Sequence, residues 1–222
     1  MQWIKSTLSV LSKDVSIEFK TRFAINTVLA FVAASLLLVL FTLRAQNLDP
    51  TPKSGLVWII ILFASLSALG RSFIAETDQK TYDLLRIYGK GSTVFVGKLF
   101  YNILFTLLIN TATFLLYSFL LDMQIVSWLA FLILLLFGTI GLSSVSTMTA
   151  AIVSQADRKG AVFSILSIPL FIPLVMLLGQ ITKAAFINNI GGEFWNYVTA
   201  LVGFAGVTIT AGILLFDFIW EE

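Results

Sequence analysis

The chain has 222 residues, of which 58% are apolar and 12% are charged, and its mean hydropathy is +0.96. About a quarter of the residues in a soluble domain are charged, so this chain cannot cover a water-facing surface and is predicted to be an integral membrane protein. It contains neither Cys nor His. Their absence excludes disulfides, thiolate nucleophiles, Cys/His zinc sites and a haem held permanently through either residue.

Six stretches are long and apolar enough to cross a bilayer as helices, which takes about twenty residues each. They are residues 23–43, 55–69, 99–121, one helix within the uncharged interval 123–156, 161–181 and 194–216. The fourth interval is too long for one upright span, and we expect a long tilted helix that is broken near Gly138 and Gly141. Little chain is left over, so residues 1–222 are predicted to form a single all-α transmembrane domain.

The basic residues predict the orientation of the spans. Eleven of the 14 Lys and Arg residues lie before the first span, in the second–third connection or in the fourth–fifth connection. Six spans place these segments on one side, and the positive-inside rule makes that side cytoplasmic, with both termini. The outer connections at residues 48–52 and 188–192 are expected to be short turns, because they are rich in Pro, and in Asn and Gly, respectively.

The N-terminal segment, residues 1–21, has the pattern of an amphipathic helix. Its apolar stripe consists of Ile4, Leu8, Leu11, Val15 and Phe19. This stripe predicts an interfacial helix that lies on the inner leaflet and leads into the first span. An ordinary helix packed on other cytoplasmic segments is the alternative.

The longest polar interval is the predicted cytoplasmic loop at residues 72–98. Within it, Thr77 or Asp78 can cap a short helix with an acidic first turn and Arg86 in its last turn. Gly89 is a suitable C-terminal stop for this helix. The loop is therefore expected to carry a short helix on the cytoplasmic side.

No motif for catalysis is found, whether HExxH, GxSxG or a nucleotide-binding Walker motif. The predicted spans contain essentially no ionisable residue, and Asp217 lies near the end of the sixth. An ion-coupled carrier usually needs such a residue inside the membrane. We therefore expect a non-catalytic membrane subunit with no metal site, which takes its energy from another protein.

Two features of the spans could serve either packing or function. The hydroxyl-rich run at residues 143–149 is typical of helix packing, which we favour over the lining of a polar path. Pro169 and Pro173 lie four residues apart, on one face of the fifth span, and predict a kink. The sequence is compatible with two interpretations of this kink, a hinge that serves in gating and a static bend.

Taken together, the six spans, the N-terminal interfacial helix and the loop helix resemble ABC-2-type (type V-like) exporter permeases. Two segments are similar, more narrowly, to the heme exporter protein B family of the c-type cytochrome maturation system. The first comprises Arg71, Phe73, Glu76, Thr81, Asp83, Leu85 and Lys98, and the second is SILSIPLFIP at Ser164–Pro173, preceded by Arg158–Gly160. One departure is Gly70, where the family often has Glu.

This resemblance implies a permease subunit that couples ATP hydrolysis by a partner to haem export or to release of a haem-loaded chaperone. A cytoplasmic ABC ATPase would dock on the loop helix. The coupling residues would be Glu76, Thr81, Tyr82, Asp83, Leu85 and Arg86. Haem would be a transported substrate rather than a bound cofactor.

The resemblance also implies a location in the bacterial inner membrane and a complex with the family's haem-handling membrane subunit. Besides these proteins we expect contact with the lipid bilayer and none with nucleic acid, and we leave a homodimer open. Two alternatives remain. One is a non-transporting scaffold of the same assembly, and the other is an ABC-2 permease for another lipophilic substrate or a polysaccharide.

The orientation can be tested because the chain has no cysteine of its own. Cysteines introduced one at a time at Asn47, Gln124 and Asn189 are expected to react with a membrane-impermeant reagent added outside intact cells. Cysteines at Thr81 and Lys159 are expected to stay silent. If only the cysteines at positions 81 and 159 were labelled, the orientation would be the reverse of the predicted one.

Overall fold

The computed structural model describes residues 2–43, 48–70, 73, 76, 81, 85, 89–154 and 159–221. Within these residues the main elements are helices, with no strand. They are α1 (Gln2–Thr21), α2 (Phe23–Leu43), α3 (Pro50–Ala68), α6 (Gly91–Leu121), α7 (Trp128–Val153), α8 (Lys159–Ile187) and α9 (Gly192–Glu221). All except α1 are long and apolar enough to cross a membrane. The predicted all-α, six-span architecture is thereby confirmed.

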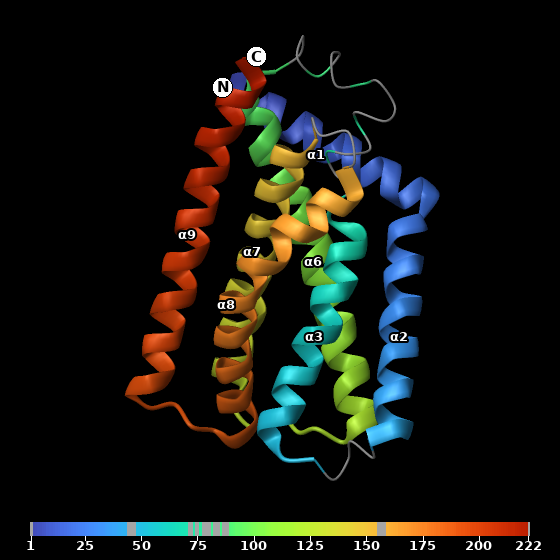
Figure 1. Ribbon diagram of the computed structural model, residues 1–222, viewed down its shortest axis with the longest axis vertical. Coiled ribbons are helices and arrows are strands. Elements are labelled where there is room, and N and C mark those ends of the chain that lie inside the picture. Colours follow the sequence, from blue (N-terminus) through green and yellow to red (C-terminus); the bar gives the residue numbers. More distant parts are fainter. Residues whose placement is uncertain are drawn as a thin grey trace.

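The spans form a bundle with both chain termini at the same end (Figure 1). α1 lies across that end, and the turn between α8 and α9 lies at the opposite end. α7 is the central helix, since it packs against α6, α8 and α9. All its residues from Gly141 to Ala151 are buried.

The predicted break in the fourth span is wrong, because α7 is one continuous helix. Its glycines serve close packing instead. A Cβ added at Gly138 would lie 2.9 Å from Leu178 Cδ2, and one added at Gly141 would lie 2.8 Å from Leu174 Cδ1. The surplus residues of the interval form an extended connection before α7, in which the Ser127 amide donates to the carbonyl of Ala185 over 2.9 Å.

Three helices begin earlier than the hydropathy pattern predicts. α3 starts at Pro50, so part of the expected outer turn is helical, because a proline in the first turn loses no intrahelical hydrogen bond. α6 starts at Gly91 rather than at residue 99, so the end of the predicted loop 72–98 belongs to a spanning helix. α8 starts at Lys159 and contains both internal prolines.

α1 forms as expected from its amphipathic pattern. Ile4, Leu8 and Phe19, which belong to the apolar stripe, are exposed in the isolated chain. The opposite face packs on α6 through Thr7 and Val10. The helix therefore has one side against the bundle and an uncovered apolar side, and its contact with the inner leaflet remains a prediction.

Polar side chains join α6 to α7 in an antiparallel ladder with a spacing of four residues on each helix. The three hydrogen bonds are Asn102–Thr147 at 2.8 Å, Thr106–Ser143 at 3.1 Å and Asn110–Thr139 at 3.0 Å. All six residues are buried. Apolar burial does not hold helices together in lipid, whereas interhelical hydrogen bonds and small side chains do. These contacts support the packing interpretation of the hydroxyl-rich run.

Candidate functional site

The site is a buried cluster of charges at the end of the bundle that carries the termini. Lys98 lies about two turns into α6, and its side chain is 1% exposed. Its Nζ donates to Asp14 Oδ2 over 3.0 Å and to Glu76 Oε1 over 3.1 Å. Lys13 also donates to Glu76 Oε1 and lies 3.5 Å from Asp14 Oδ1. Two cations and two anions thus neutralise one another.

The position of Asp14 follows from the way α1 packs on α6. Thr7, Val10 and Asp14 occur at a helical spacing, and all three are buried. They meet α6 at Gly97, where an added Cβ would lie 2.8 Å from Val10 Cβ and 3.0 Å from the Thr7 carbonyl oxygen. The glycine next to Lys98 therefore lets the two helix backbones approach closely enough for the ion pair to form.

Residues of the loop between α3 and α6 complete the cluster. Thr81 Oγ1 donates to Glu76 Oε2 over 2.5 Å. Lys98 Nζ also lies 5.3 Å from the centroid of the Phe73 ring, within the range of a cation–π contact. Phe73 packs on Phe216 of α9, with ring centroids 4.9 Å apart. The loop is thus bound to α1, α6 and α9 together.

Electrostatics keep the Glu76 carboxylate ionised. Burial alone would raise its pKa, but the Lys98 ammonium and the hydrogen bonds from Lys13 and Thr81 lower the pKa to about 2. Removing one partner from such a cluster leaves an uncompensated buried charge, which is far more costly than the net gain from the pair. The four side chains therefore act as a unit.

The two ends of the loop are also held tightly. A Cβ at Gly70 would lie 2.7 Å from the Phe163 ring of α8, so the backbone at the start of the loop packs directly against α8. A Cβ at Gly91 would lie 2.8 Å from Asp217 Oδ1 and 2.9 Å from Trp220 Cβ of α9. The Asp217 carboxylate thus lies beside the N-terminus of α6, where a negative charge is favourable.

A groove of about 370 Å³ opens beside the cluster, between α1, the loop and the start of α6. It is lined by Lys5, Ser6, Ser9, Val10, Lys13, Leu85, Gly89, Thr93 and Val94. Its walls therefore combine apolar side chains with two lysines. Leu85 is half-buried and lies at its wall.

The structure brings together three of the residues that the sequence singled out for coupling. Glu76 and Thr81 belong to the charge cluster, and Leu85 lines the groove. Tyr82, Asp83 and Arg86, for which coupling roles are predicted, lie outside the residues that the structure describes. The predicted helix caps at residues 77 and 78 lie outside them too. The amides of residues 85 and 89 donate to the carbonyls four residues earlier, as expected for a helix. Thr81, however, which the prediction placed inside that helix, is not helical, and its amide donates to the Glu76 carbonyl.

The two prolines do not join this site. Pro169 and Pro173 lie inside α8 with exposed rings, and α8 bends along its length in Figure 1. Sequence reasoning missed the pairing of Lys13, Asp14 and Lys98. The available signal was an acidic residue off the apolar stripe of the first helix, together with a lysine at the edge of an apolar span.

Comparison with known proteins gives a consistent result. A family model for the CcmB protein matches residues 5–217, a range that includes the whole charge cluster. A curated relative, heme exporter protein B of Haemophilus influenzae, is 24% identical over 204 residues, which are 88% of this chain and 90% of the relative.

Lys98 can be tested for its role in holding this end of the bundle together. Lys98→Met is expected to destabilise the protein by about 3–5 kcal/mol, because two buried carboxylates lose their main cation. The measurement is unfolding in detergent micelles, with proteolysis of α1 as a local probe. Lys20→Met removes an exposed charge from α1 and serves as the control, and equal effects of the two substitutions would contradict the assignment.

The depressed pKa of Glu76 predicts a specific pH dependence. Its value in the folded chain, about 2, is below the ordinary 4.5, so the stability it contributes is present in full above pH 4.5. That contribution is lost as the pH falls from 4.5 towards 2. Across this pH range the free energy of unfolding should fall more steeply with decreasing pH in the wild type than in Glu76→Gln. The same pH dependence in both proteins would refute the mechanism.

Proposed function

The chain belongs to the CcmB family, and on that premise we propose that it is the transmembrane permease subunit of an ABC transporter needed for c-type cytochrome biogenesis. The transported substrate is haem, which the name of the curated relative supports. The energy comes from a cytoplasmic ABC ATPase, and the haem is exported or released on a loaded chaperone. A haem-handling membrane subunit completes the complex in the bacterial inner membrane.

The observation that carries this proposal is the double ion pair of Lys98. A lysine inside a spanning helix binds the loop through Glu76 and the amphipathic helix through Asp14. A movement of the loop driven by the partner ATPase is therefore transmitted directly to α6 and α1. Packed elements of this kind switch between discrete arrangements rather than deforming gradually.

Within the loop, the proposed coupling residues have two different tasks. Glu76 and Thr81 are buried or half-buried and bonded to each other, so they position the loop and do not contact the ATPase. Leu85 lies at the groove beside Lys5 and Lys13 and is the proposed contact. Tyr82, Asp83 and Arg86 are proposed to extend this contact.

Pro169 and Pro173 supply flexibility in the proposed cycle. A proline inside a helix leaves the carbonyl of the residue four positions earlier without its usual bond. α8 begins beside Gly70 through Phe163, so movement of the loop reaches the bent helix directly. A bend that opens and closes there would gate the path.

The test separates docking from transmission. Leu85→Ala is expected to weaken co-purification of the ATPase by about tenfold, the usual effect of truncating an anchoring side chain. Glu76→Gln is expected to retain the ATPase while lowering the yield of c-type cytochromes. The matched control is Leu136→Ala, an exposed leucine in the bilayer-spanning α7.

Two results would contradict the proposal. Unchanged ATPase binding and unchanged cytochrome yield in both loop variants would remove the coupling role of the loop. The second result concerns single cysteines introduced into the spans of the intact complex. If their reactivity does not change when nucleotide is added, the non-transporting scaffold is favoured.

A further inference from the structure

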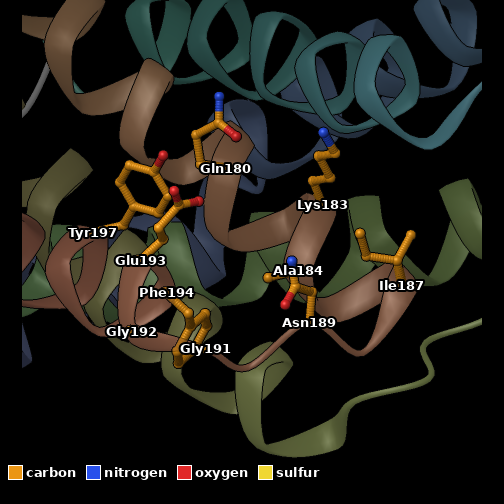
Figure 2. A pocket seen from close by; sticks show the side chains of 10 residues that line it. All are labelled: Gln180, Lys183, Ala184, Ile187, Asn189, Gly191, Gly192, Glu193, Phe194 and Tyr197. Carbon is orange, nitrogen blue, oxygen red and sulfur yellow. The ribbon is translucent and has the colours of Figure 1, made fainter.

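A second pocket lies at the opposite end of the bundle, between the last turns of α8 and the first turns of α9 (Figure 2). Its volume is about 300 Å³. The two helices and the turn between them contribute Gln180, Lys183, Ala184, Ile187, Asn189, Gly191, Gly192, Glu193, Phe194 and Tyr197. It is separated from the charge cluster by the length of the bundle (Figure 1).

The walls of this pocket carry opposite charges. Lys183 lies on the α8 side, and Glu193 lies on the α9 side with Tyr197 one turn further along the same helix (Figure 2). The ion pairs found among the described residues all lie in the charge cluster, and none joins Lys183 to Glu193. An occupant of the pocket therefore meets a cation on one side and an anion on the other.

The surroundings of the pocket point to a lipid. It lies where two spanning helices end, so its depth corresponds to the membrane–water interface. Ile187, which lines the pocket, is 45% exposed in the isolated chain, and Trp195 in the first turn of α9 is 49% exposed. Trp is typical of this level of a bilayer. Acyl chains can thus lie along the apolar surfaces of α8 and α9 while a headgroup enters the pocket.

We propose that this pocket binds the headgroup of an aminophospholipid, phosphatidylethanolamine. The phosphate is held by the Lys183 ammonium and by the side-chain amides of Gln180 and Asn189. The ethanolammonium group donates to the Glu193 carboxylate and the Tyr197 hydroxyl. This assignment goes beyond the proposed transport function and does not depend on it.

The chemistry of the two walls distinguishes this headgroup from other common ones. Phosphatidylcholine has a quaternary nitrogen without an N–H, so it cannot donate a hydrogen bond to Glu193. Phosphatidylglycerol has the phosphate but no cation, and its net negative charge is repelled by Glu193. The three lipids share the phosphate contact with Lys183, so the carboxylate provides the selectivity.

The experiment uses the full chain, purified in mild detergent and exposed in turn to vesicles of each of the three lipids. Retained lipid is counted by native mass spectrometry. We expect phosphatidylethanolamine to be retained about tenfold more strongly than phosphatidylcholine, the effect of one charge-assisted hydrogen bond. Glu193→Gln should reduce it to the phosphatidylcholine level, and Lys183→Gln should weaken both lipids.

Asp122→Asn is the matched control, because it removes a carboxylate from an exposed residue at the end of α6, outside the pocket. It should leave the lipid preference unchanged. Equal retention of phosphatidylethanolamine and phosphatidylcholine by the wild type would overturn the proposal, and this comparison needs no variant. Stronger retention of phosphatidylglycerol would overturn it too and indicate a simple anion site.

Discussion

One buried lysine constrains the whole end of the bundle that carries the termini. The Lys98 ammonium lies inside a spanning helix, where an unpaired charge is costly. Its two carboxylate partners are 84 and 22 residues away along the chain. The N-terminal helix and the loop after α3 must both be in place for this charge to be neutralised, so the three segments are stable only together.

The rest of the bundle depends on close approach rather than on apolar burial. In lipid the outside of a helix is as favourable for a leucine as the inside, so the hydrophobic effect does not decide which helices pair. α7 takes the central position because its glycines and hydroxyl side chains let α8 come close and bond to α6. The most hydrophobic faces are left for the lipid, as the exposed apolar residues of α2 and α9 illustrate.

The two ends of the molecule use charge in opposite ways. At the end with the termini, lysines and carboxylates pair with one another and fix the geometry of a loop. At the other end, Lys183 and Glu193 line one pocket without forming a pair. In the first arrangement the charges neutralise one another, and in the second both charges line a pocket.

The amino-acid sequence determined the membrane class, the six spans and the amphipathic N-terminal helix, because hydropathy and periodicity are local properties that survive in any packing. It also drew attention to Glu76, Thr81 and Leu85. It did not determine the pairing of Lys98 with Asp14 and Glu76, the early start of α6 or the unbroken course of α7. Only the tertiary structure decided these, because each depends on a partner from a distant part of the chain. From the sequence alone, a lysine near a span boundary is expected to be a membrane anchor, and the carboxylates that pair with Lys98 come from distant segments. Likewise, a glycine in a span suggests a break, whereas Gly138 and Gly141 are packed against leucines of another helix.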